Sequence, residues 1–84
     1  MSAFASALEP VQRRMERVKL PESFVRELLV PESTISLNDA AMRWAGMPNK
    51  NERAALHEVL DALAQAGFLQ ADGAERWRVL RGPD

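Results

Sequence analysis

Cationic and amide side chains gather where one strongly periodic apolar segment, residues 52–66, begins. The candidate binding residues at this place are Lys50, Asn51, Arg53 and His57. Arginine and asparagine can hydrogen-bond to the edges of bases, lysine can meet a phosphate, and the positive end of a helix favours an anionic backbone. The alternative interpretation is that Asn49 or Asn51 only caps the helix, and that Arg53 only pairs with a neighbouring carboxylate.

A second group of cations follows a turn signal near the end of the sequence. Asp72 and Gly73 separate two strand-like runs and predict a β-hairpin with positive φ at both turn positions. The arginines expected on the outward side of the hairpin are Arg76, Arg78 and Arg81. Guanidinium groups at these positions could bind phosphates or enter a narrow minor groove. Alternatively, their charge protects an edge strand from pairing with other strands.

The residue content argues against a catalytic or metal centre. The chain has one histidine, no cysteine and no tyrosine, and it lacks a glycine-rich phosphate loop, so few titratable groups could converge in a pocket. His57 with Asp61 one helical turn later supplies fewer ligands than a zinc centre needs. We therefore expect no enzymatic activity, no metal and no cofactor.

Length and composition favour one small intracellular module. The chain has 84 residues, of which 46% are hydrophobic and 27% charged, as in ordinary folded domains. Without cysteine the fold must be held by packing alone. The N-terminal stretch lacks the basic start and apolar block of a signal peptide, and no segment is apolar enough for a membrane span. We expect a cytoplasmic protein with no membrane partner.

An apolar stripe with alternating spacings of four and three residues marks the first helical segment. Its members are Phe4, Leu8, Val11, Met15 and Val18. Because Pro10 interrupts the stripe, the firmer helix is expected from about Glu9, with fraying or a kink before it. The stripe could pack on the domain's own core or against a second copy, and because it is longer than a small core needs, the hypothesis is a homodimer through this helix. The helix also carries four cations, Arg13, Arg14, Arg17 and Lys19. They are typical of a solvated face, with phosphate contacts as a second role.

Start and stop signals predict three further helices and a short strand. The second helix is expected within residues 21–31, an extended piece at 34–35, the third helix within 36–46 and the fourth at 52–66. Trp44 and Trp77 are assigned to the core, since packing explains both positions without a ligand.

The order of these elements resembles the winged helix-turn-helix family over about residues 21–81. The run Leu-Asp-Ala-Leu-Ala-Gln-Ala-Gly-Phe-Leu at residues 60–69 is similar to the end of a recognition helix that turns through Gly67 into the first wing strand. The resemblance implies a mainly α fold with a small β-hairpin, a winged helix-turn-helix with an extra N-terminal helix. Residues 1–20 would be a helical extension and residues 21–84 the winged helix domain.

The resemblance implies that the helix at 52–66 lies in the major groove of duplex DNA, while the wing at 68–81 contacts neighbouring backbone or minor groove. Glu58 and Asp61 repel phosphate and confine contact to the first two turns of the helix. The break from Gly46 to Asn51 is longer than the family's tight turn, which bears on the angle between the two helices. The sequence thus predicts a small transcriptional regulator. A protein-interaction module or a subunit of a larger assembly is the alternative, which the formal net charge of −1 favours.

Overall fold

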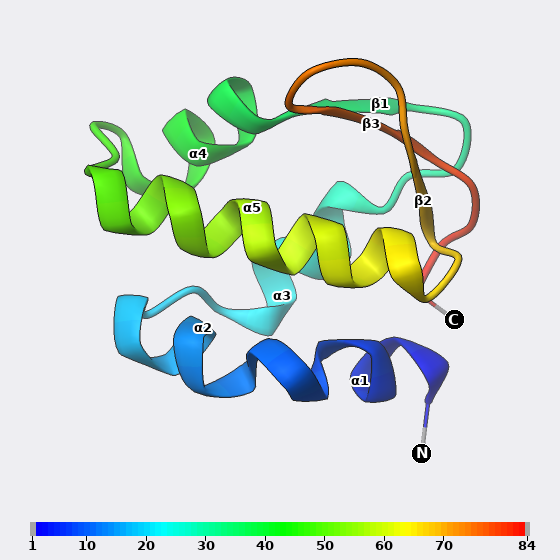
Figure 1. Cartoon of the computed structure of the whole chain (residues 1–84), viewed down its shortest axis with the longest axis horizontal. Coiled ribbons are helices and arrows are strands. Elements are labelled where there is room, and N and C mark those ends of the chain that lie inside the picture. Colours follow the sequence, from blue (N-terminus) through cyan, green and yellow to red (C-terminus); the bar gives the residue numbers. More distant parts are fainter. Residues whose placement is uncertain (1, 84) are drawn as a thin grey trace.

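The computed structural model describes residues 2–83 and is mainly helical, with one small antiparallel sheet (Figure 1). The elements in chain order are α1 (Ala3–Leu8), a 3-10 turn (Glu9–Val11), α2 (Gln12–Val18), α3 (Glu22–Leu28), β1 (Thr34–Ser36), α4 (Leu37–Ala45), α5 (Lys50–Gln65), β2 (Leu69–Ala71) and β3 (Arg76–Val79). α5 runs through the middle of the molecule, with α1 and α2 along one side and α4 and the sheet along the other. The predicted coarse class, helices with a small β element, is confirmed.

The N-terminal helices are part of the core beneath α5. Ser2 caps α1 by accepting a hydrogen bond from the backbone N–H of Ala5 at 3.1 Å, and Phe4 is fully buried, with its ring edge to face against Phe68 at 6.1 Å between centroids. The predicted kink is present, because Pro10 lies in the 3-10 turn. The residues before it form the separate helix α1, in which Phe4 and Leu8 are buried.

The apolar stripe that suggested a homodimer is covered by the chain itself. Phe4, Leu8, Val11 and Met15 are buried in the same core as residues from α5 and the sheet, and Val18 packs against that core. The observation behind the homodimer hypothesis therefore no longer supports it, and the oligomeric state stays a prediction. Of the two tryptophans assigned to the core, Trp77 is buried, whereas Trp44 is only partly buried at its edge.

The helix pair α4 and α5 is joined more tightly than the sequence predicted. Asn49 is the N-cap: its Oδ1 accepts from the backbone N–H of Glu52 at 2.7 Å, and the Glu52 carboxylate accepts from the backbone N–H of Asn49 at 2.9 Å. α5 therefore begins at Lys50 rather than at Glu52. The break shrinks to the four residues 46–49, with Gly46 at a φ of 72°, so the predicted long break is wrong.

The predicted hairpin is part of a three-stranded sheet in which β3 lies between β1 and β2. Ala71 pairs with Trp77 and Leu69 with Val79, which confirms the antiparallel pairing. The predicted two-residue turn is wrong, because the positive φ values fall at Gly73 (110°) and Glu75 (56°). A two-residue turn at 72–73 would have paired Leu69 with Arg76 and turned that arginine toward the core, since paired residues share a face.

Candidate functional site

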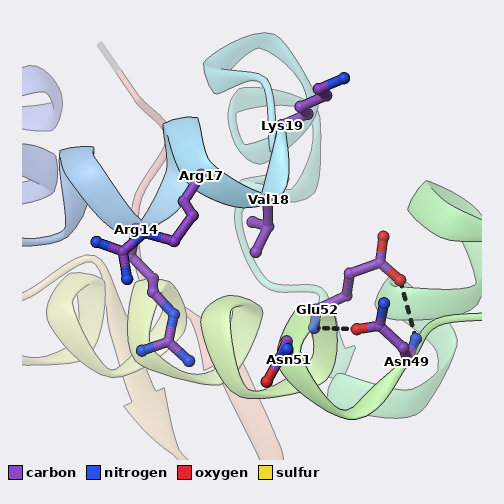
Figure 2. A pocket seen from close by; sticks show the side chains of 7 residues that line it. All are labelled: Arg14, Arg17, Val18, Lys19, Asn49, Asn51 and Glu52. Carbon is purple, nitrogen blue, oxygen red and sulfur yellow. Dashed lines mark hydrogen bonds between the residues drawn. The ribbon is translucent and has the colours of Figure 1, made fainter.

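An open hollow of about 490 Å³ lies between the end of α2 and the start of α5 (Figure 2). Most of the side chains that line it are cations or amides, namely Arg14, Arg17, Lys19, Asn49 and Asn51. The other two lining residues are Val18 and Glu52. α2 and the residue that ends it supply the cations, and the first turn of α5 supplies the amides. Figure 2 shows Arg14 reaching toward α5, whereas Lys19 points outward from the end of α2.

The charge at this hollow is positive and only partly neutralised. Arg14 is bound to Glu58 of α5, with Nη1 and Oε2 2.8 Å apart, and the Glu52 carboxylate is held in the capping box. By contrast, Arg17 and Lys19 make no ion pair with any residue in the range 2–83, and neither does Lys50, which is exposed in the first turn of α5 but does not line the hollow. The unpaired N–H groups of the 16-residue helix α5 add partial positive charge at the same place. An anionic group of a ligand would be stabilised here.

The first turns of α5 place the predicted residues in different surroundings. Lys50 and Asn51 are exposed, and Asn51 is not the cap. Arg53 is half-buried and donates from Nη1 to Oδ1 of Asn38 on α4 at 3.0 Å. The sequence-based alternative, that Arg53 pairs with a carboxylate, is therefore wrong, because its partner is a neutral amide.

His57 is the predicted site residue most constrained by its neighbours. Its Nδ1 lies 3.0 Å from the carboxylate of Asp61, and its ring packs edge to face against Trp77 of β3, with 5.3 Å between centroids. His57 thus lies on the side of α5 that faces the sheet. Its placement links α5 to β3, away from the hollow lined by α2.

The arginines at the end of the chain do not form one row. Arg76 and Arg78 are exposed on the central strand, opposite in direction to the buried Trp77; the interpretation that they protect an edge strand is therefore wrong. Arg81 follows the end of β3, and its guanidinium lies 4.2 Å from the centroid of the Phe68 ring. None of the three lines the hollow beside α5.

The sequence predicts only a secondary role for the cations of α2. Their charge and spacing were visible in the sequence, and the apolar stripe on the same segment predicted which face of α2 is buried. The sequence does not show which element packs against the buried face of α2. Because α2 packs along α5, Arg14, Arg17 and Lys19 come to lie beside the first turn of α5.

Comparison of the chain with protein-family models, with curated proteins and with solved structures gives no match. Within the described part of the chain, His, Cys, Asp and Glu residues form no group that could hold a metal ion. No helix there is long and apolar enough to cross a membrane. The functional inference therefore depends on the helix pair and the charged hollow.

Proposed function

We propose that the chain is a winged helix-turn-helix protein that binds duplex DNA with the start of α5. Three features of the fold support this. The order α3, β1, α4, α5, β2, β3 is that of the family, and β3 pairs with both other strands. The four-residue connection between α4 and α5 contains Gly46, as is typical of a helix-turn-helix. A second helix so placed is the element that enters the major groove.

The observation that carries the proposal is the gathering of cations from α2 beside the exposed first turn of α5. With α5 in a major groove, Lys50, Asn51 and Arg53 would face base edges or the nearest phosphates. Arg17 and Lys19, on the neighbouring element, would meet the phosphate backbone at the rim of the groove. In this arrangement the residues of α5 would select a DNA sequence, whereas Arg17 and Lys19 would supply affinity for any sequence. Such a protein suits transcriptional regulation.

The acidic residues of α5 restrict the contact to its N-terminal half. Glu58 and Asp61 lie further along α5 and are paired with Arg14 and His57. Pairing lowers their repulsion of phosphate but offers DNA no donor. The loop between β2 and β3 also carries exposed acids, Asp72 and Glu75. We therefore assign the wing a smaller share of binding than the start of α5.

A second candidate function, docking onto a protein, is favoured by two exposed methionines. Met47 in the connection between α4 and α5 is 93% exposed, and Met42 on α4 is 52% exposed. Flexible thioether side chains are common at surfaces that bind other proteins. The formal net charge of −1 points the same way.

The test is the affinity of the chain for a random-sequence duplex, measured by fluorescence anisotropy over a range of salt concentrations. We expect the logarithm of the affinity to fall linearly with the logarithm of the salt concentration. Arg17→Ala should flatten that slope by about one unit, because one phosphate contact is lost. The matched control is Arg13→Ala, which removes the same charge from the same helix outside the hollow and should leave the slope almost unchanged.

Two results would decide against the proposal. Absence of salt-dependent duplex binding would remove the DNA function and leave protein docking. Equal flattening by Arg13→Ala and Arg17→Ala would mean that net charge, and not the hollow beside α5, governs the interaction.

A further inference from the structure

Asn38 on α4 has both ends of its side-chain amide engaged. Its Oδ1 accepts a hydrogen bond from Nη1 of Arg53 at 3.0 Å, and its Nδ2 lies 3.7 Å from Sδ of Met42, one turn further along α4. The amide oxygen thus faces a guanidinium, which can only donate, and the amide nitrogen faces a sulfur atom, which can accept. Both contacts lie at the exposed surface, and together they favour one orientation of the amide. Asn38 therefore offers Arg53 an acceptor of defined position across the helix pair.

The bond to Asn38 orients Arg53 without neutralising it. Arg53 makes no ion pair with any described acidic residue, and an amide oxygen carries no net charge. A guanidinium has five N–H donors, so one bond leaves the remaining donors free for a ligand. The long side chain is also restricted before binding, which lowers the entropy cost of any contact that it makes. Lys50 and Asn51, in the same turn of α5, make no side-chain bond of this kind within the described chain.

We infer that Asn38 is a positioning residue that holds Arg53 for recognition of a guanine in the major groove. This inference rests on the proposed DNA-binding function. Arg53 donates two parallel hydrogen bonds to O6 and N7 of one guanine, a pairing that no other base offers. Asn38 does not touch the base. It keeps the guanidinium in the plane in which both bonds can form, and so contributes to sequence preference rather than to general affinity.

The test begins with a preferred site, selected by the wild-type chain from a randomised duplex library. Affinities are then measured for that site and for duplexes in which each guanine is replaced in turn. Arg53→Ala should lower the preference for guanine at one position by about 5- to 150-fold. Asn38→Ala should lower the preference at the same position by a smaller factor, at least about twofold. Because Asn38 carries no charge, the salt dependence of its variant should match that of the wild type.

Two further variants separate positioning from a structural role. The double variant Asn38→Ala with Arg53→Ala should have the same guanine preference as Arg53→Ala alone, since the bond between the two side chains is already lost in the single variant. Asp39→Asn, at the next position on α4, should leave the guanine preference intact. Urea unfolding of each variant identifies any loss of folded protein, which would lower affinity for every duplex alike.

The contrary outcomes are distinct. If Arg53→Ala abolishes the guanine preference and Asn38→Ala leaves it intact, or if Asn38→Ala weakens all duplexes equally, Asn38 is not a positioning residue. If the wild type binds duplex in a salt-dependent way without any base preference, the inference fails and the proposed function stands. If the wild type does not bind duplex, the proposed function fails, and the inference fails with it.

Discussion

Two groups of cations on this chain have similar charge and exposure but different surroundings. The first, which lies at the N-terminal end of α5 and is called the α5-end group, consists of Arg17, Lys19 and Lys50. The second, called the sheet pair, consists of Arg76 and Arg78. None of these five makes an ion pair with a residue in the described range. The α5-end group combines cations from two elements with a helix N-terminus and a hollow. The sheet pair stands on the outward face of one strand, where Thr34 and Gln70 flank Arg78. Arg76 also lines a hollow of about 430 Å³, but there the acidic side chains of Glu27 and Asp39 share the lining with it and with Arg43.

This difference shows that charge and spacing along the sequence do not reveal which elements surround a group of cations. Alternation along β3 correctly predicts that Arg76 and Arg78 face outward. It does not report which other elements share that side of the molecule. The α5-end group gains its potential role because a separate helix brings further cations to the place where α5 offers its amides. We therefore expect the two groups to respond differently to DNA.

The largest expected effect concerns the packing of the N-terminal helices, which include the α2 residue Arg17, against the rest of the core. Phe4→Ala should lower the free energy of unfolding by about 3–5 kcal/mol, because a fully buried ring between α1 and the core is removed. The measurement is urea denaturation, with Ser6→Ala on the exposed side of the same helix as the control. If the N-terminal helices were an independent extension, Phe4→Ala would leave unfolding of the remaining domain unchanged.

Removing two charges from each group tests whether the α5-end group contributes more to duplex affinity than the sheet pair. The double variant Arg17→Ala with Lys19→Ala should flatten the salt dependence of duplex affinity by about two units, one for each phosphate contact. The variant Arg76→Ala with Arg78→Ala removes the same charge and should change that slope far less. A larger change from the sheet pair would reverse the assignment and place the DNA against the sheet.

A smaller effect is expected from the cap that sets the start of α5. Asn49→Ala should lower the free energy of unfolding by about 0.5–2 kcal/mol, since the N–H of Glu52 loses its acceptor. Asn51→Ala is the matched control and should barely change stability, while it weakens DNA binding if Asn51 contacts the duplex. Equal destabilisation by the two variants would contradict the assignment of Asn49 as the cap.

The smallest effect is expected at the ion pair between α2 and α5. Glu58→Gln should change the free energy of unfolding by less than about 1 kcal/mol, because both side chains are substantially exposed. It should also raise duplex affinity modestly, since Arg14 becomes free beside the hollow. Glu16→Gln, on the exposed side of α2, removes the same charge away from the pair. An equal gain from both variants would reduce the effect to net charge.

Burial within each element could be predicted from sequence because periodicity reports it directly. The apolar stripe on α1 and α2 and the alternation around Trp77 both agree with the observed burial. Start and stop signals also gave the order of elements. The choice between Asn49 and Asn51 as cap could not be predicted, because either residue type can cap and only the backbone geometry decides.

Contacts between elements were less accessible to sequence reasoning. The turn after β2 depends on which register buries Leu69 with Val79, which is a property of the whole sheet. The stripe on the first helices was predicted to meet a second copy, since the sequence does not report that α5 covers it. For the same reason, the position of the α2 cations beside α5 could not be predicted. Nor could the hydrogen bond between Asn38 and Arg53, which are fifteen residues apart.

The most direct test of the central claim is a titration of the isotope-labelled chain with a short duplex, followed by backbone amide shifts. We expect the largest changes at residues 17–19 and 50–53, with little change at Arg76 and Arg78 on the sheet. Changes confined to the sheet residues, or no changes up to high duplex concentration, would contradict it.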